Sequence, residues 1–237
     1  MLLAAVLPCC GLYPTGPAAQ RCNRTHSTAI YCPQISKEAT IGAIFDDRNA
    51  EITPLIQAAE VNGEAAPNLS IIPSNIHLAV TAERVISLHF RERMLDRALK
   101  KLADSYDVIL LDCPPNLGVI TANAIYTADE ILIPTTYGRY SLDGIVDLFA
   151  SIEELREDRP GGRYILRNAF DSRTKQTNDY IDRQLESVRD LVLTTVIRKS
   201  EAINQAQISG EPIFTYDPTG HGTQDFEALT QEVLRHG

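Results

Sequence analysis

The sequence predicts an α/β fold in which a mostly parallel sheet carries helices on both faces. The first indication is the run from Val108 to Leu111, because four consecutive apolar residues are typical of a parallel strand buried on both sides. The second is the order of the chain after residue 68, where short apolar runs alternate with longer segments of helical period. This alternation is typical of parallel strands joined by helical crossovers, which cover the two faces of a sheet.

The expected strands are the short apolar runs of this pattern. They span residues 69–72, 107–112, 130–134, 163–170 and 193–197. The expected helices have apolar residues at the 3.6-residue period. They span residues 91–102, 117–127, 142–155, 177–191, 200–208 and 223–234. Ser141 is the expected N-cap of the third helix, and Pro160-Gly161-Gly162 ends it.

Asp112 stands at the carboxyl end of the most apolar of these strands. In open α/β sheets this edge faces the ligand crevice, and a carboxylate there can hold Mg²⁺ beside a nucleotide. Pro114 and Pro115 stiffen the turn that follows and delay the next helix. Asp112 as a simple cap of that helix is the alternative, and the strand alone does not decide between the two.

Further segments on both sides of Asp112 carry a resemblance to a known family. They are Ile72-Pro73-Ser74-Asn75-Ile76-His77-Leu78, Asn116-Leu117-Gly118-Val119-Ile120-Thr121-Ala122-Asn123-Ala124, Ala128-Asp129-Glu130-Ile131-Leu132-Ile133-Pro134-Thr135, Tyr140-Ser141-Leu142-Asp143-Gly144, Phe170-Asp171-Ser172-Arg173-Thr174-Lys175 and Gly210-Glu211-Pro212-Ile213-Phe214-Thr215-Tyr216-Asp217-Pro218. In this order and spacing the chain resembles the ParA-type partition ATPases, deviant-Walker P-loop proteins that include the MinD group. The resemblance covers roughly residues 38 to 237.

The resemblance implies a P-loop NTPase-like sheet, ATP with Mg²⁺ as cofactors, and an ATP-dependent homodimer. It also implies a ParB-like centromere-binding protein and non-specific DNA as partners, and a cytoplasmic, nucleoid-associated location. Asp112 is then the metal and cofactor residue, and Asn168 and Pro212 lie near the base. Arg198 and Lys199 are the DNA-binding residues, and no catalytic residue is assigned. For Asn168 and Pro212 a turn, and for the two cations a solvated strand end, remain the alternatives.

The phosphate loop of that family is absent from the sequence. The pattern G-x-x-x-x-G-K-[ST] occurs nowhere, because Lys199-Ser200 lacks the glycines and Gly220-His221-Gly222-Thr223 lacks the Lys. The family's Asp before Pro-Gln is replaced in Cys32-Pro33-Gln34. ATP hydrolysis, which the resemblance implies, is therefore left open for this chain.

The N-terminal residues differ in composition from the rest. Residues 1–37 hold four of the five cysteines and none of the 31 acidic residues. A secretory signal is disfavoured because the first apolar run is short and lacks a basic start, and a metal knuckle is disfavoured by the adjacent Cys9 and Cys10. The favoured hypothesis is that residues 1–32 are out of frame, follow an incorrect start or are disordered, and that residues 33–237 are the ParA-like domain.

This hypothesis has a structural consequence for the sheet. In the family the P-loop strand lies beside the strand that ends at Asp112, and each backbone group left unpaired by its loss would cost roughly 1–3 kcal/mol. We therefore expect poor solubility unless residues 1–32 supply a substitute strand. Thr28 to Tyr31 is the expected candidate.

Charge and hydropathy limit the possible partners. The net charge of −9 disfavours non-specific nucleic-acid binding by the whole surface, so any DNA contact has to be a local patch. No run approaches the roughly 18 apolar residues of a membrane span. Cys113 is expected to be a packing residue in a reduced cytoplasm.

Two functions from different classes follow. The first is a ParA-like partitioning protein for a plasmid, a chromosome or a mobile element, defective in ATP binding as written. The second is a non-enzymatic regulator or remnant that keeps the partner and DNA surfaces. Asp112 favours the first by ancestry, and the missing Lys favours the second.

The out-of-frame hypothesis predicts a specific coding sequence. Translation of all reading frames upstream of the Pro33 codon should contain Gly-Gly-x-Gly-Lys-[ST]. Nucleotide sequencing of the locus checks this, and its absence from every frame would rule the hypothesis out.

Overall fold

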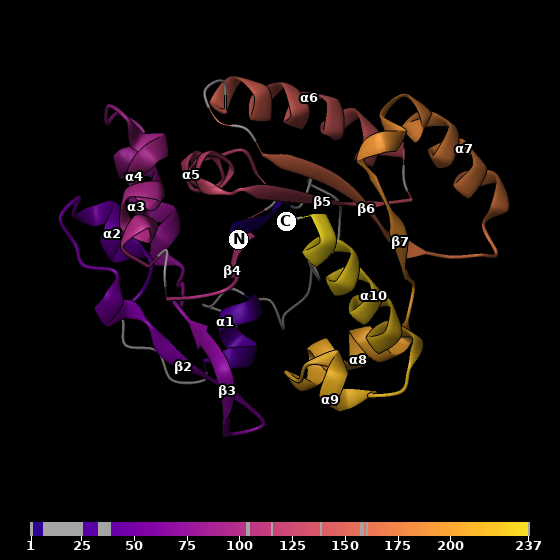
Figure 1. The fold of residues 1–237 in the computed structure, drawn as a ribbon, viewed down its shortest axis with the longest axis horizontal. Helices are drawn as coiled ribbons and strands as arrows, with labels where there is room; N and C mark the ends of the chain where they lie inside the picture. The colour runs from indigo at the N-terminus through magenta and orange to yellow at the C-terminus, as the bar shows by residue number, and fades with distance from the viewer. Residues whose placement is uncertain are drawn as a thin grey trace.

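A five-stranded parallel sheet is the centre of the molecule (Figure 1). The computed structural model describes residues 2–6, 26–32, 39–102, 105–114, 116–137, 139–156, 159 and 161–236. The strand order is β4-β1-β5-β6-β7. The strands are β1 (Leu2–Val6), β4 (Ile109–Cys113), β5 (Glu130–Thr136), β6 (Gly162–Phe170) and β7 (Val192–Arg198). All pairs in this sheet are parallel, as the alternating sequence pattern predicts.

The strand β1 lies between β4 and β5, with Leu3 in register with both Leu110 and Glu130. The expectation that Thr28 to Tyr31 would supply this strand is wrong, because these residues belong to helix α1 (His26–Tyr31). The sequence Leu2-Leu3-Ala4-Ala5-Val6 is short, but a central strand of five residues pairs on both edges. The backbone groups of β4 and β5 therefore have a partner strand at the N-terminus.

Helices cover both faces of the sheet around β5, β6 and β7. On one face, Ile131 and Ile133 pack with residues of the helices that Figure 1 shows above the sheet. These helices are α5 (Val119–Thr127), α6 (Arg139–Leu155) and α7 (Lys175–Leu185). On the other face, Leu132 and Leu166 pack against Leu229 of α10 (His221–His236). This part of the fold is as the sequence predicts.

A second core lies beside β4. It joins the short helices that precede β4 in the chain to α5, and Phe45, Ile52 and Leu95 are buried in it. The elements that contribute to it are α2 (Gly42–Asp46), η2 (Thr53–Leu55), α3 (His77–Val85), α4 (Met94–Leu99) and η4 (Lys100–Leu102). The turn η3 (Arg91–Arg93) directly precedes α4 and has no buried residue. The expected helix at 91–102 is thus one α-helical segment between two 3-10 turns, and its predicted apolar stripe is buried.

An antiparallel hairpin stands apart from the main sheet. Its strands are β2 (Gln57–Val61) and β3 (Glu64–Ile71), and Asn62 and Gly63 at its tip have positive φ, as a tight hairpin turn requires. The strand expected at 69–72 is the end of β3, and its pairing is with β2 rather than with the parallel sheet.

The strand β4 departs from the prediction of burial on both faces. Leu110 is 63% exposed and Val108 is 43% exposed. Ile109 and Leu111 pack against the second core, whereas Leu110, which lies on the opposite face of β4, is exposed. The apolar run predicts the parallel pairing correctly but does not reveal the uncovered face.

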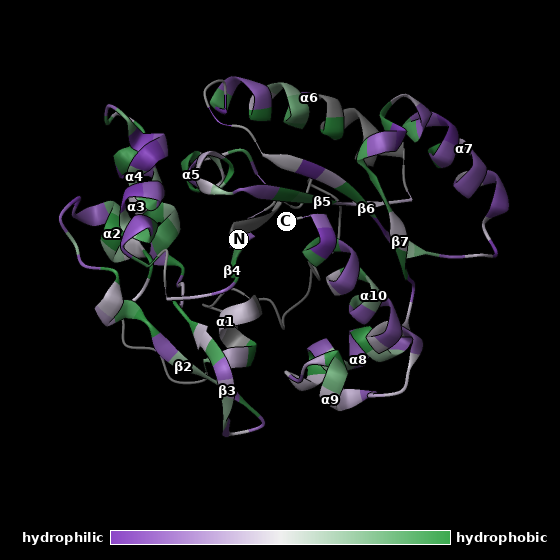
Figure 2. Cartoon of the chain, viewed as in Figure 1, coloured by the Kyte–Doolittle hydropathy of each residue, from purple (hydrophilic) through white to green (hydrophobic). Residues whose placement is uncertain are grey.

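The remaining elements follow the predicted order with shifted ends. They are η5 (Glu186–Leu191), α8 (Glu201–Ser209) and α9 (Ile213–Tyr216). The helix α6 begins at Arg139, so Ser141 is within it and the prediction of Ser141 as its N-cap is wrong. Figure 2 shows a largely hydrophilic outer side on α7, beside more hydrophobic strands. Among the described helices, none combines the length and apolar character needed to cross a bilayer.

Two carboxylates of α10 hold the outer edge of β7. Glu232 accepts hydrogen bonds from the backbone N–H of Thr194 at 2.7 Å and of Thr195 at 2.8 Å. Two helical turns before Glu232, Asp225 accepts a hydrogen bond from the backbone N–H of Arg198 at 2.9 Å. Burial raises the pKa of the Glu232 carboxyl, but the hydrogen bonds from Thr195 and Thr194 outweigh it and hold the pKa at about 2.

Replacement of Glu232 tests this contact. Glu232→Gln should lower the free energy of unfolding at pH 7 by about 1–3 kcal/mol, because it removes a charge that receives several hydrogen bonds. The folded pKa is below the ordinary value of 4.5, so this contribution is complete above pH 4.5 and is lost as the pH falls toward about 2. Urea titrations at several pH values measure it.

The matched control is Glu227→Gln, on the exposed side of the same helix. It should change the free energy of unfolding by less than about 0.5 kcal/mol. Equal losses in the two variants at pH 7 would contradict the role of Glu232.

Candidate functional site

Asp112 lies at the carboxyl end of β4, directly beside β1. Ala5 is in register with Asp112, and Val6 is in register with Cys113. Both strands therefore end at the same edge of the sheet, the edge at which open α/β folds bind ligands. Asp112 is exposed at this edge, so its carboxylate is accessible to a ligand.

The hydroxyl of Ser27 is the closest described partner of Asp112. Ser27 Oγ donates a hydrogen bond to Asp112 Oδ2 at 2.5 Å. Ser27 is in the first turn of α1, which is the helix that follows β1 in the chain. Residues 7–25, which connect the two, are outside the described part of the chain. A strand, a connection and a helix whose first turn reaches the neighbouring strand's Asp is the order of elements in a P-loop protein.

The next residue of α1, Thr28, connects the site to the segment that begins at Ile72. Thr28 is buried, and its Oγ1 accepts a hydrogen bond from the backbone N–H of Ser74 at 3.0 Å. The Ser74 hydroxyl is buried and has no hydrogen-bond partner within the described chain. The segment Ile72-Pro73-Ser74-Asn75 therefore lies beside the start of α1, and it brings an unpaired oxygen to this end of the sheet.

The donor set at this edge fits Mg²⁺. Carboxylate and hydroxyl oxygens are the ligands this ion prefers, and in P-loop proteins a Ser or Thr and a strand-end Asp hold it. The described residues contain no group of three or more His, Cys, Asp or Glu that could hold a metal by themselves. Asp112 and Ser27 could hold the ion only together with phosphate oxygens and water, which is how Mg²⁺ usually binds.

Among the described residues, Cys32 and Cys113 are buried packing residues. Burial, with a smaller contribution from the Asp112 charge, raises the pKa of the Cys113 thiol to about 12, so Cys113 stays neutral. Cys32 is 4% exposed, and its thiol donates to Gln57 Oε1 at 3.2 Å. Cys32 follows helix α1, so it does not stand at a strand end as its family motif would require. Pro33 and Gln34 are outside the described residues.

Asn168 and Pro212 lie on different segments. Asn168 is near the carboxyl end of β6, in register with Thr136. Its Oδ1 accepts the N–H of Ala169, whose φ of 57° forms an irregularity in the strand. Three strand spacings of about 4.8 Å separate β4 from β6, so a ligand touching both Asp112 and Asn168 has to cross the ends of β1 and β5.

Pro212 is the N-cap of α9, and its carbonyl accepts the N–H groups of Thr215 and Tyr216. The preceding Glu211 accepts a hydrogen bond from the Asn62 side chain at 3.2 Å. Pro212 therefore lies in a segment that contacts the tip of the β2–β3 hairpin. Its described contacts are those of a helix start.

Arg198 and Lys199 differ in their surroundings. Arg198 Nη2 is 2.6 Å from Asp225 Oδ1, and Arg198 Nε contacts both carboxylate oxygens. These hydrogen bonds raise the pKa of Arg198 and commit its charge to α10. Lys199 is exposed, and its backbone N–H donates to the Phe170 carbonyl. Lys199 is thus the more accessible of the two cations.

Ser27 is the site residue that the sequence patterns do not single out. In G-x-x-x-x-G-K-[ST] the hydroxyl residue directly follows the Lys, and here His26 directly precedes Ser27. Without the glycines and the Lys, the Ser-Thr pair after His26 is not distinguishable from other Ser-Thr pairs. Only the contact with Asp112 identifies it.

Comparisons with known proteins show the family of the chain and, separately, solved structures of the same fold. The AAA_31 family, described as an AAA domain, matches residues 20–161. The sporulation initiation inhibitor protein Soj of Bacillus subtilis is 32% identical over 197 residues, which cover 82% of this chain and 75% of Soj. An uncharacterized protein of Mycobacterium tuberculosis is 30% identical over 212 residues, which are 88% of this chain but 65% of that relative's length. McdA of Cyanothece, solved as an ATP complex, is 20% identical with a TM-score of 0.72, and the match covers 98% of this chain and 84% of McdA.

The ion pair between Arg198 and Asp225 should stabilise the folded state. Arg198→Ala should lower the free energy of unfolding by about 1–2 kcal/mol, because it leaves the Asp225 carboxylate, 8% exposed, without its cation. Lys199→Ala, the neighbouring control, should change it by less than about 0.5 kcal/mol. Urea titration measures both. Adding Asp225→Asn to Arg198→Ala should restore part of the loss, and equal effects of the two single variants would show that the pair does not stabilise the fold.

Proposed function

Because the chain belongs to the family of ParA-type partition ATPases, we propose that it acts in the segregation of DNA, as a ParA-like protein with an incomplete ATP site. The observation that carries the proposal is the contact between Ser27 and Asp112 at the ends of β1 and β4. The same two residue types, on the same two elements, hold Mg²⁺ in P-loop nucleotide hydrolases. The DNA that is segregated belongs to a plasmid, a chromosome or a mobile element.

Asp112 and Ser27 are the proposed metal residues. They would hold Mg²⁺ beside the phosphates of ATP, where the ion supplies positive charge. Asp112 provides the charge that retains the ion, and the Ser27 hydroxyl, already 2.5 Å from Asp112, orients that carboxylate. Asn168 and Pro212 are the proposed contacts of the base, and the Asn168 amide nitrogen is the group that can donate to it.

The phosphate-binding half of the site is the proposed defect. A P-loop binds phosphates with converging backbone N–H groups and one Lys, and no Gly-Gly-x-Gly-Lys-[ST] precedes Ser27 in the sequence. We propose that residues 1–32 have a replaced sequence, in which the phosphate-binding residues before Ser27 are lost while Ser27 itself is retained, and that residues 33–237 form the ParA-like unit. The presence of β1 and α1 supports a replaced sequence over a loss of these elements.

The partners are proposed from family membership. They are a ParB-like centromere-binding protein, non-specific DNA and, when ATP is bound, a second copy of the chain, in the cytoplasm and on the nucleoid. Lys199 and Arg198 are the family-based DNA residues, and the accessible Lys199 is the stronger candidate.

A second function is favoured by the sequence before Ser27. A chain without the phosphate-binding Lys but with a stable sheet can act as a non-enzymatic regulator that keeps the partner and DNA surfaces. In that case the ParB-like protein would bind this chain in the absence of nucleotide.

Calorimetric titration with ATP and Mg²⁺ separates these functions from an intact ATPase. The chain as written should show no micromolar ATP binding, because Asp112 and Ser27 hold only a metal that is already bridged to phosphates. Micromolar binding that is lost in Asp112→Ala would contradict the proposed defect.

A repaired variant tests the position of the site. Cys22→Gly, Asn23→Gly, Thr25→Gly and His26→Lys together place Gly-Gly-Arg-Gly-Lys directly before Ser27. This variant should gain micromolar ATP binding that disappears when Asp112→Ala is added. The matched control carries the same three glycines with His26→Ala and should not bind. If the repaired variant also fails to bind while remaining folded, Ser27 does not occupy the proposed position.

A further inference from the structure

The outer face of the α4 region is basic although the protein is acidic. Residues 91–101 contain five of the 22 Lys and Arg residues but two of the 31 acidic residues. The exposed cations of this face are Arg93, Arg97, Lys100 and Lys101. We call this set the α4 basic face. It stands out because the whole chain has a net charge of −9.

Helix geometry explains why these cations share one side. Arg97 in α4 and Lys101 in the following turn η4 are four residues apart, and both line the same groove. The opposite stripe is the buried one. Its members are Met94, Leu95, Ala98, Leu99 and Leu102. The packing of that stripe into the second core fixes the basic stripe toward solvent.

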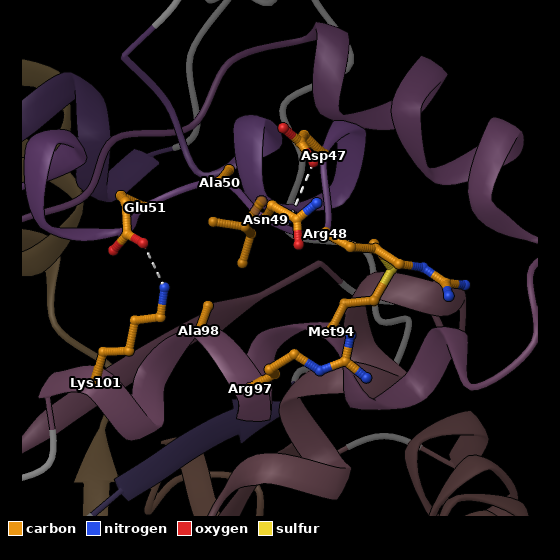
Figure 3. Close-up of a pocket in the computed structure, with 10 residues that line it drawn as sticks. Asp47, Arg48, Asn49, Ala50, Glu51, Met94, Arg97, Ala98 and Lys101 are labelled. Atoms are coloured by element: carbon orange, nitrogen blue, oxygen red, sulfur yellow. Dashed lines mark hydrogen bonds and ion pairs between the residues drawn. The ribbon is translucent and has the colours of Figure 1, made fainter.

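A groove runs along this face. It has a volume of about 320 Å³ and lies between α4 and the segment that follows α2 (Figure 3). Arg97 and Lys101 come from the α4 side, and Arg48 comes from the opposite side. Figure 3 shows the Arg48 and Arg97 side chains on either side of Met94, extending in the same direction. Cations thus line both walls.

The cations of this region differ in their partners. Arg93 pairs with Glu92, Lys100 with Asp96 and Lys101 with Glu51. Within the described chain, Arg48 donates to the carbonyl of His89, and neither Arg48 nor Arg97 forms an ion pair. Asp47 Oδ1 accepts the backbone N–H of Asn49 at 2.9 Å and keeps its negative charge. The groove therefore presents two guanidinium groups that are not paired with a described carboxylate.

We infer that the α4 basic face and Arg48 bind the phosphate backbone of DNA. The inference deepens the proposed function, on which it rests, by naming a local patch on a surface that otherwise repels DNA. Arg198 is committed to Asp225, whose side chain is only 10% exposed, so the end of β7 offers one accessible cation. This face offers Arg48 and Arg97, which have no carboxylate partner among the described residues, and Lys101, whose partner Glu51 is 63% exposed and therefore weakly bound.

The shape of the face favours DNA over an acidic peptide. From Arg93 in η3 to Lys101 in η4 the chain advances by about 12–16 Å along α4, which spans about four phosphates of one strand. The side chains are long and exposed, with Lys100 at 69% and Lys101 at 45% exposure. A peptide site would need apolar pockets between the charges, and the apolar lining of this groove is limited to Ile44, Met94, Ala50 and Ala98.

The test compares two triple variants of equal charge. Arg48→Ala, Arg97→Ala and Lys101→Ala together remove three cations from this groove. The control removes three exposed cations of α7 and η5, Lys175→Ala, Arg183→Ala and Arg189→Ala, which Figure 1 places at the other end of the molecule. Fluorescence anisotropy with a labelled DNA duplex of arbitrary sequence, without nucleotide, is recorded from about 50 to 200 mM salt. Arg97→Glu alone is a second variant in case the triple variant is poorly folded.

The slope of log affinity against log salt should flatten by about 2–3 in the groove variant, since each phosphate contact contributes about 0.9. The α7 variant should leave the slope nearly unchanged, and Arg97→Glu should weaken binding. Equal flattening in both triple variants would reduce the effect to net charge and overturn the inference.

Other outcomes separate this inference from the proposed function. If Lys199→Ala flattens the slope and the groove variant does not, the DNA site lies at the end of β7, which overturns the inference and leaves the proposed function intact. If labelled polyglutamate binds the groove as tightly as DNA does, the face is a site for acidic polypeptides and the inference is wrong. If the folded chain binds no DNA at low salt, the inference fails, while the ATP titrations on the repaired variant still test the proposed function.

Discussion

The pairing of β1 with β4 and β5 is the interaction on which the rest of the structure depends. On one side of β1 lies the core built from α2, α3, α4 and β4, and on the other lie the strands and helices from β5 to α10. Five residues, Leu2 to Val6, supply the backbone hydrogen bonds that join the two sides. Without them β4 and β5 would each have an unpaired edge in the middle of the sheet, and a domain stable by only about 5–15 kcal/mol tolerates few such losses.

The site depends on the same strand. Because β1 and β4 end together, the connection from Val6 leads the chain to α1, and α1 brings Ser27 to Asp112. The site is therefore assembled from residues near both ends of the first half of the chain. In the proposed function, the metal-binding side consists of the oxygen atoms of Asp112 and Ser27, whereas the phosphate-binding side depends on a loop sequence that the chain lacks. A substitution of sequence can remove one half of such a site while the fold keeps the other.

The sequence predicts the part of the fold in which each strand has its own apolar run. The strands from β4 to β7 and most of the helices between them follow from hydrophobic periodicity, and so does the position of Asp112. Periodicity does not reveal β1, because a run of five apolar residues does not distinguish a strand from another buried segment. Its role as a strand follows only from pairing with residues more than 100 positions away. Of the hairpin, the sequence predicts only the end of β3, because both strands are rich in Ala and polar residues and β3 is mostly exposed. Ser27 could not be predicted because its significance is a contact, not a pattern.

The carboxylates of α10 have a consequence for pairing between molecules. β7 is the last strand on its side of the described sheet, and an open strand edge is a template for pairing with other chains. Here Glu232 and Asp225 accept the backbone N–H groups of Thr194, Thr195 and Arg198. A second strand could pair with these groups only by displacing two carboxylates that would then lose their hydrogen-bond donors. The helix α10 thus protects the sheet against edge-to-edge aggregation, and its detachment would open that edge to other copies.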